Sequence, residues 1–144
     1  MVTKSPNYRK NSSHLANSKH QVHGHDTIGM VAIDVNGSIA CGTSSNGAAF
    51  KIPGRVGDSP IMGAGAYCET GVGGATGTGD GDQMMRFLPS FAAVEYMKQE
   101  FSATDACEKA VEPIRKYFTN ASGALICLKA DGTFGGAKLN FQSF

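Results

Sequence analysis

The sequence changes character at Thr27, and this change limits which part of the chain can enter a hydrophobic core. Residues 1–26 are rich in Asn and Ser, carry four basic residues against the single acidic Asp26, and contain few large apolar side chains. Such a segment buries too little apolar surface to offset its conformational entropy. The chain has 144 residues, 41% of them hydrophobic, which is enough for one compact domain. We therefore predict a flexible basic leader over 1–26 and one domain over 27–144.

The composition argues against two classes of partner. Four scattered basic residues in the leader do not form the dense charge run of a nucleic-acid-binding arm. The leader lacks the apolar centre of a signal peptide, and no segment approaches the roughly 18 apolar residues of a membrane span. We expect neither nucleic acid nor membrane as a partner.

Strands are predicted at both ends of the domain. Apolar segments over 27–34 and 38–45 flank the Asn36-Gly37 pair, which is the strongest short signal for a β-hairpin. Thr27 would lie at the outer tip of the first strand. Residues 122–141 predict two further strands that are joined at an Asp-Gly pair.

Two helices are predicted between these strand pairs. The first begins near Asp82 and contains Pro89, which is tolerable in a first turn or marks a break. The second begins at Ser102, with an acidic residue three positions on as a weak capping box, and runs towards Phe118. Pro113 should kink or shorten this second helix.

The region from Gly54 to Gly81 is rich in glycine and is predicted as one irregular loop. Loops of this length in a compact domain are more often functional than idle. The predicted order is strand, strand, helix, helix, strand, strand. Strands grouped at both ends with helices in the middle favour a layered α+β sandwich over an alternating parallel fold.

Common cofactor and metal motifs are absent from the sequence. The run GVGGATGTGDGD matches neither the dinucleotide fingerprint nor a phosphate loop. Asp80 and Asp82 have the spacing of the first EF-hand ligands without the rest of that loop. The cysteines show no Cys-x-x-Cys spacing, which argues against zinc. We expect no cofactor and no metal.

Thr27 is a candidate nucleophile because of what precedes it. All four histidines lie before Thr27, so a chain cut after Asp26 would contain no imidazole for a Ser-His or Cys-His pair. The remaining arrangement uses the α-amino group of an N-terminal threonine as the base. An α-amino group has a pKa of about 7.7–8.0, close to the value at which a general base works best. An Asp-Thr pair at a strand start also occurs by chance, so the dipeptide alone does not decide.

Six blocks of the sequence carry a family resemblance. In chain order they are HDTIGMVAI, GTSSNG, FKIPGRVGDSPIMGAGAY, TGDGD, MRFLPSFAAVEYM and GALIC, spread from residue 25 to about residue 136. They resemble the C-terminal half, or β-subunit, of the glycosylasparaginase (aspartylglucosaminidase) family, within the asparaginase type 2 superfamily of N-terminal-nucleophile hydrolases. The resemblance implies an αββα sandwich, of which this chain would supply about four antiparallel strands and two or more helices.

The resemblance implies an autocatalytic nucleophile and its helpers. The Thr27 hydroxyl would attack the carbonyl of Asp26, and hydrolysis of the resulting ester would free the Thr27 amino group. In turnover, Thr27 would cleave the side-chain amide of N4-(beta-N-acetylglucosaminyl)-L-asparagine during glycoprotein degradation. The Thr78 hydroxyl and the Gly79 N–H would stabilise the oxyanion. Ser45 stands near the nucleophile where the family usually has threonine, and it keeps the hydroxyl.

Two residues of the glycine-rich region match the family's substrate-binding pair. Arg55 would bind the α-carboxylate of the aspartyl group, since its planar fork meets a carboxylate with two parallel hydrogen bonds. Asp58 would bind the α-ammonium group. Without the resemblance, an exposed salt bridge within a loop is the simpler interpretation of the two residues.

The four cysteines fall into two groups. Spacing alone leaves open whether Cys107 and Cys127 are a reduced, buried pair, and the resemblance implies a disulfide between them. Cys41 and Cys68 have no counterpart in the family, and we expect them to be free, buried thiols.

The resemblance and the sequence together suggest a location. A disulfide indicates an oxidising compartment, and Asn11 and Asn120 begin glycosylation sequons. We expect a lysosomal protein if the source is eukaryotic, and a periplasmic or secreted one otherwise.

The resemblance also implies a partner and leaves three functions open. The family's N-terminal α-subunit, from the same precursor, would complete the sandwich and the pocket in a heterotetramer of two α- and two β-subunits. We therefore expect this chain to be partial and to need that partner for activity. The leading function is glycosylasparaginase, the second is an isoaspartyl peptidase or L-asparaginase with the same nucleophile, and the third is an inactive fragment that serves only as a structural partner.

Overall fold

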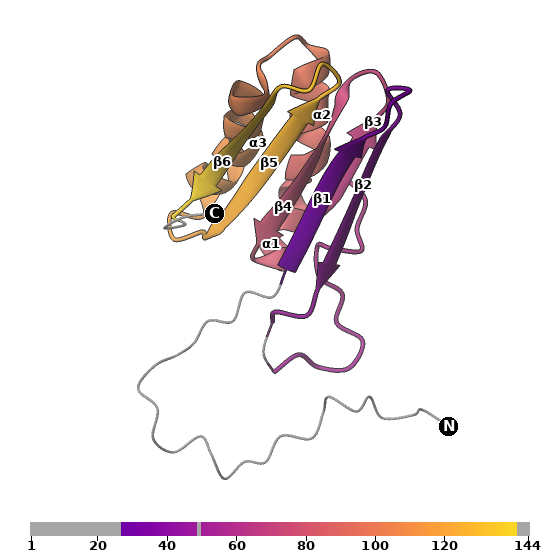
Figure 1. Ribbon diagram of the computed structural model, residues 1–144. Coiled ribbons are helices and arrows are strands. Elements are labelled where there is room, and N and C mark those ends of the chain that lie inside the picture. The colour runs from indigo at the N-terminus through magenta and orange to yellow at the C-terminus, as the bar shows by residue number, and fades with distance from the viewer. Residues whose placement is uncertain (1–26, 49, 141–144) are drawn as a thin grey trace, which may run out of the picture.

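The computed structural model describes residues 27–48 and 50–140 (Figure 1). The predicted leader, Asp26 and all four histidines lie outside the described residues. Within those ranges the chain forms six strands and three helices. The elements are β1 Thr27–Ile33, β2 Ile39–Ser45, β3 Ala66–Glu69, β4 Gly73–Gly79, α1 Gly81–Phe87, α2 Pro89–Lys98, α3 Ala103–Tyr117, β5 Gly123–Lys129 and β6 Phe134–Leu139.

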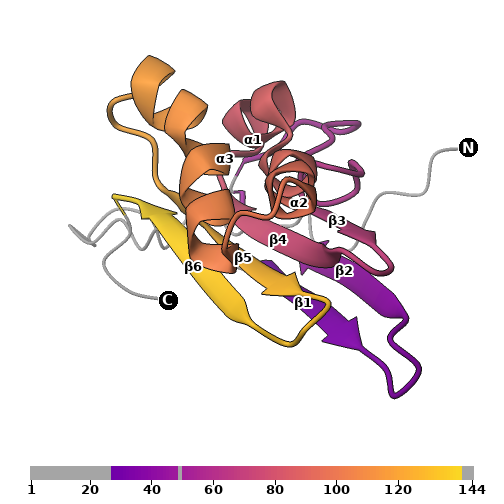
Figure 2. The same ribbon diagram turned by 90° about the horizontal axis from the view of Figure 1, so that it is seen from above.

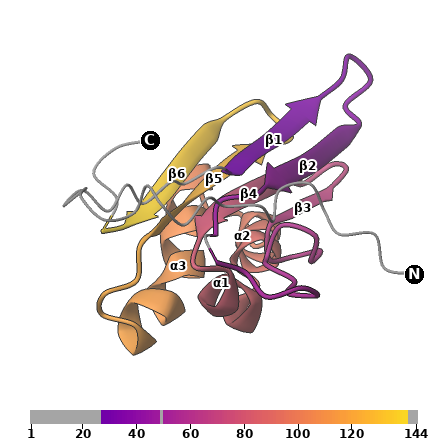
Figure 3. The same cartoon turned by 90° about the horizontal axis from the view of Figure 1, so that it is seen from below.

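These elements form three layers. Strands β3, β4, β5 and β6 pair in that order into one antiparallel sheet, and β1 and β2 form a separate antiparallel hairpin. The three helices lie on one side of the larger sheet and the hairpin lies on the other (Figures 2 and 3). The α+β class predicted from the sequence is confirmed, and the layers are consistent with part of an N-terminal-nucleophile hydrolase sandwich.

The predicted hairpin around Asn36-Gly37 is confirmed. The turn is closed by the carboxylate of Asp34, which accepts hydrogen bonds from the N–H groups of Asn36 and Ser38, both at 2.8 Å. Gly37 has a φ of 81°, a conformation that favours glycine. The second predicted pair of terminal strands is also present, as β5 and β6.

The prediction of one irregular loop from Gly54 to Gly81 is wrong, because β3 and β4 lie within it. Strand β4 has the sequence GGATGTG, and five of its seven residues are buried. A Cβ on Gly74 would lie 2.6 Å from Cγ1 of Val31 in the hairpin, and one on Gly77 would lie 2.6 Å from Cε of Met84 in α1. Small residues therefore let both neighbouring layers approach this strand, and their weak β-propensity hides it in the sequence.

The prolines affect the helices differently. Pro89 marks a break, since Leu88 before it adopts φ 47°, and it occupies the first turn of α2 as the sequence analysis allowed. Pro113 does not shorten α3, which continues to Tyr117. Val111 and Ile114, on either side of Pro113 in the sequence, are each 1% exposed. Burial of these side chains therefore keeps the helix continuous past the proline.

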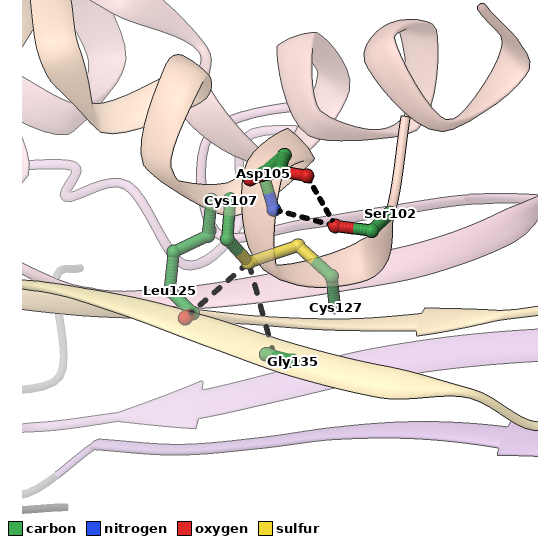
Figure 4. The surroundings of a disulfide bond; sticks show 6 residues. All are labelled: Ser102, Asp105, Cys107, Leu125, Cys127 and Gly135. Carbon is green, nitrogen blue, oxygen red and sulfur yellow. Dashed lines mark hydrogen bonds between the residues drawn. A yellow bond between two sulfur atoms is a disulfide. The ribbon is translucent and has the colours of Figure 1, made fainter. Parts of the chain in front are cut away.

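The core lies between the helices and the larger sheet, and a disulfide crosses it. Cys107 of α3 and Cys127 of β5 are joined with a Cα–Cα distance of 6.3 Å, as the resemblance implied (Figure 4). The same figure shows Ser102 capping α3, with its hydroxyl oxygen accepting from the Asp105 N–H at 3.1 Å. The capped helix is thus bonded covalently to the sheet it covers.

The side of the larger sheet that faces away from the helices is only partly covered. The hairpin packs over β3 and β4, while Ile126 of β5 and Phe134 of β6 remain 40% and 83% exposed. The outward residues Ile28 and Met30 of β1 are 66% and 65% exposed. Two apolar faces are therefore uncovered, one on the larger sheet and one on the outer side of the hairpin, and together they are called the uncovered apolar surface. None of the described helices is long and apolar enough to cross a membrane.

Candidate active site

Thr27 and Ser45 form a hydroxyl pair at one end of the hairpin. They are partners in the antiparallel register of β1 and β2, so their side chains leave the hairpin on the same face. The two hydroxyl oxygens lie 2.9 Å apart, within hydrogen-bonding distance. Ser45 can therefore orient the Thr27 hydroxyl, the relation that the resemblance implied.

The packing of the hairpin on β4 predicts that Thr27 lies near Thr78. The backbone of Gly29 lies against the side chain of Thr76, and Val31 lies against Gly74. The residue number rises along β1 and falls along β4 from the first contact to the second, so the two strands pack in opposite directions. Continuing the same register by two residues brings Thr27 over Thr78. The beginning of β1 and the end of β4 lie at the same end of the molecule in Figure 1.

Arg55 and Asp58 lie against the backbone that follows Thr78 and Gly79. A Cβ on Gly81 would lie 3.0 Å from Nη2 of Arg55 and 3.2 Å from Oδ1 of Asp58. Gly81 begins α1, directly after the turn that leaves β4. The predicted substrate-binding pair therefore borders the predicted oxyanion residues, although the two groups are some twenty residues apart in sequence.

Asp58 is a buried carboxylate with an unused acceptor. Asp58 is 8% exposed, and its Oδ2 atom has no hydrogen-bond partner among the described residues. Burial raises the pKa of this carboxyl, and Asp80 raises it further, while backbone N–H groups and Arg55 oppose the shift. A buried acceptor of this kind favours a cationic ligand, because a cation would compensate the lost hydration.

Arg55 forms a long ion pair with Asp82 and not with Asp58, the partner considered in the sequence analysis. Its Nη2 atom lies 3.8 Å from Oδ1 of Asp82, whose side chain is 75% exposed. An exposed pair at this distance contributes little to stability, so the guanidinium remains available to a ligand carboxylate. The sequence analysis weighed Asp82 only as a calcium ligand and missed this contact. The position of Asp82 in the TGDGD block, which also contains the predicted oxyanion residues, was the sequence signal for a role in the site.

The remaining sequence-predicted residues have different outcomes. Asp26 lies outside the described residues, so the Asp26–Thr27 peptide bond, which we predict to be cleaved, is not described. Cys41 and Cys68 are free thiols within the described part of the chain, but both are half-buried, whereas we had expected full burial. They pack at the junction of two layers and not inside the helix-covered core.

Comparison with known proteins identifies relatives along most of the chain. A sequence profile described as Asparaginase matches residues 2–144. A mouse protein named N(4)-(beta-N-acetylglucosaminyl)-L-asparaginase is 53% identical over 123 residues, which cover 85% of this chain and 36% of the mouse protein. A rat protein of the same name is 50% identical over 129 residues, covering 90% of this chain and 37% of the rat protein. The chain thus spans little more than a third of the length of these relatives.

Proposed function

The chain belongs to the asparaginase family, and from that premise we propose that it is the nucleophile-bearing part of an amidohydrolase that cleaves N4-(beta-N-acetylglucosaminyl)-L-asparagine. The observation that supports this proposal is that the Thr27–Ser45 hydroxyl pair and the end of β4, whose following turn borders Arg55 and Asp58, lie at the same end of the molecule. These residues come from separate elements. Each supplies a chemical group that the reaction needs.

We propose that the nucleophile is made by cleavage of the chain itself. The Thr27 hydroxyl attacks the carbonyl carbon of Asp26, and the acyl group moves from the Thr27 nitrogen to its oxygen. Water then hydrolyses the ester, which releases a carboxylate at Asp26 and a free amino group at Thr27. Before cleavage this nitrogen is a peptide nitrogen with no useful basicity, so cleavage creates the base.

In turnover, the Thr27 amino group accepts the proton of its own hydroxyl as the oxygen attacks the side-chain amide carbon of the substrate. The Thr78 hydroxyl and the Gly79 N–H donate to the developing oxyanion. The proton passes to the leaving glycosylamine as the C–N bond breaks. Water then attacks the aspartyl ester, aspartate leaves, and the Thr27 hydroxyl is restored.

Asp58 and Arg55 would recognise the aspartyl group of the substrate. The unpartnered Oδ2 of Asp58 accepts from the α-ammonium group, and the Arg55 guanidinium meets the α-carboxylate in place of Asp82. Both contacts are remote from the scissile bond. They therefore orient the amide carbon towards Thr27.

We further propose that an N-terminal α-subunit from the same precursor covers the uncovered apolar surface of Ile28, Met30, Ile126 and Phe134. Strand β1 supports this proposal, because among the described residues no strand pairs with its edge opposite β2. An unpaired edge beside exposed apolar side chains is suited to accept a further strand. Assembly of two such pairs into a heterotetramer, and a lysosomal location in a eukaryotic source, are proposals that rest on the resemblance and on the disulfide.

The test uses the chain expressed alone and together with the N-terminal part of the mouse relative. Mass spectrometry should find a product that begins at Thr27, and that product should hydrolyse the glycosylated asparagine faster than isoaspartyl dipeptides or free asparagine. Faster hydrolysis of isoaspartyl dipeptides or of asparagine would assign the chain to the sibling peptidase or L-asparaginase. An uncleaved chain without turnover in both preparations would refute the proposal and leave a structural partner.

A matched pair of variants separates catalysis from folding. Thr27→Ser keeps a hydroxyl and should retain cleavage and measurable activity, whereas Thr27→Ala should abolish both. Circular dichroism of the two variants checks that each is folded.

A further inference from the structure

Two cysteines that the proposed reaction does not use meet where the hairpin packs on the larger sheet. Cys41 lies on β2 and Cys68 on β3, and these two strands are packed together. Cys41 shares the inward face of β2 with Ile39, two residues before it. The carbonyl oxygen of Ile39 lies 3.6 Å from Sγ of Cys68. Cys68 therefore points at the inward row of β2.

A second set of contacts places the same two residues together. Cys68 pairs with Gly74 across β3 and β4, and Cys41 pairs with Val31 across the hairpin. A Cβ on Gly74 would lie 2.6 Å from Cγ1 of Val31 and 3.0 Å from Cβ of Cys68. The hairpin residue beside Cys41 and the Cys68 side chain thus converge on one glycine.

The chemistry of Cys41 agrees with this arrangement. Burial raises the pKa of the Cys41 thiol to about 12, and a side-chain hydrogen bond to Cys68 and the charge of that group raise it too. A thiolate at Cys41 is therefore disfavoured while both cysteines are reduced. The pair is stable as two thiols, yet both residues are partly exposed, which leaves a route for a small reagent.

We propose that Cys41 and Cys68 are a reversible dithiol–disulfide pair, which on oxidation forms a second disulfide that joins the hairpin to the larger sheet. The oxidant is a low-molecular-weight disulfide such as oxidised glutathione. One cysteine, as its thiolate, attacks a glutathione sulfur and displaces one glutathione thiolate. The other cysteine loses its proton and attacks the protein sulfur of the mixed disulfide, which releases the second glutathione. Two protein thiols are oxidised and one glutathione disulfide is reduced to two thiols.

This pair differs from the Cys107–Cys127 disulfide in exposure and in what it connects. Cys107 and Cys127 are 0% and 2% exposed and join a helix to the sheet beneath it. The partly exposed pair Cys41–Cys68 would join the two layers whose separation sets the distance from Thr27 to Thr78. Oxidation would therefore hold the nucleophile in place over the oxyanion residues, a consequence that rests on the proposed function, whereas formation of the bond does not.

The experiment follows each cysteine by peptide mapping across a series of glutathione redox buffers. The purified chain is equilibrated, quenched with acid, alkylated and digested with trypsin, which places Cys41 on peptide 20–51, or 27–51 after cleavage at Thr27, and Cys68 on peptide 56–86. We expect the two alkylated peptides to disappear together and one cross-linked pair to replace them, without a lasting glutathione adduct. The Cys107–Cys127 cross-link should persist in buffers that open the new one.

Two variants and a second readout make the test decisive. In Cys41→Ala, Cys68 should retain glutathione, because the resolving thiol is missing; in Cys68→Ala, Cys41 should take up little glutathione, because burial disfavours its thiolate. Oxidation should raise the thermal midpoint of the wild type by up to about 10 °C, from the loop that the bond closes, and leave both variants unchanged. Separate glutathione adducts on Cys41 and Cys68 in the wild type, or two thiols that stay alkylatable at every ratio, would overturn the proposal. Neither readout depends on activity, so failure here is distinct from failure of the proposed reaction.

Discussion

Gly29→Ala is the substitution that most directly tests how the hairpin sits on the larger sheet. A Cβ at Gly29 would collide with Oγ1 of Thr76 and lie 2.9 Å from its Cγ2 atom. Thr76 cannot simply turn away, since it is 4% exposed and its hydroxyl donates to the carbonyl of Gly65 at 3.1 Å. Either the hairpin lifts off β4 or this hydrogen bond breaks.

The expected cost follows from these two effects. Overpacking of a close contact costs about 1–3 kcal/mol, and a lost buried hydrogen bond costs about 0.5–1.5 kcal/mol more. We expect Gly29→Ala to lower the free energy of unfolding by about 2–4 kcal/mol, which lowers the urea midpoint by on the order of 1 M. Urea titration followed by circular dichroism measures this change.

The control lies on the neighbouring strand of the same hairpin. A Cβ on Gly42 would meet no atom within 4 Å, so Gly42→Ala should leave stability unchanged or raise it by less than about 1 kcal/mol. Adding Thr76→Ala to Gly29→Ala should recover part of the loss, because the colliding hydroxyl and methyl are removed. If Gly29→Ala and Gly42→Ala have the same stability, the hairpin does not pack on β4 in the described register.

Three further predictions concern the proposed reaction, each measured by steady-state kinetics on glycosylated asparagine, and a fourth concerns folding stability, measured by urea titration. Thr78→Val, which keeps the shape and removes the hydroxyl, should lower kcat about 10²- to 10³-fold, while Thr78→Ser should retain most of it; equal activities would exclude an oxyanion role. Ser45→Ala should lower kcat through the loss of the 2.9 Å contact with Thr27, whereas the adjacent, outward Ser44→Ala should not, and an equal effect of both would point to general disruption of β2. Because burial raises the pKa of Asp58, its carboxylate becomes protonated at a higher pH than an exposed aspartate, so KM should rise as the pH falls through this raised value. Asp58→Asn should show a high KM that does not change over the same range; a wild-type KM independent of acid pH would contradict the ammonium-binding role. The raised pKa of Asp58 affects folding in the opposite sense to substrate binding. The ionised carboxylate lowers the stability of the native state above the raised pKa, and this penalty disappears as the pH falls below the ordinary value of 3.8. Asp58→Asn should therefore be as stable as the wild type or more stable at neutral pH.

Local signals in the sequence were sufficient for the elements whose structure depends on neighbouring residues. The Asn36-Gly37 turn and the Ser102 cap were predicted because their hydrogen bonds are made within a few positions of the chain. The family resemblance likewise came from the sequence alone. It indicated Thr27, Ser45, Thr78, Gly79, Arg55 and Asp58 as site residues before any geometry was known, although their roles are still proposals.

The tertiary structure decided the features that depend on the approach of distant segments. Helices on one side of strand β4 and the hairpin on the other leave space only for glycine and other small side chains. This packing explains why the strand consists of residues with low β-propensity. The contact of Arg55 with Asp82 and the convergence of Cys41 and Cys68 join residues that no local pattern relates. Sequence periodicity reports which face of an element is buried, but not which residue of another layer lies opposite, because that register is set by packing between the layers.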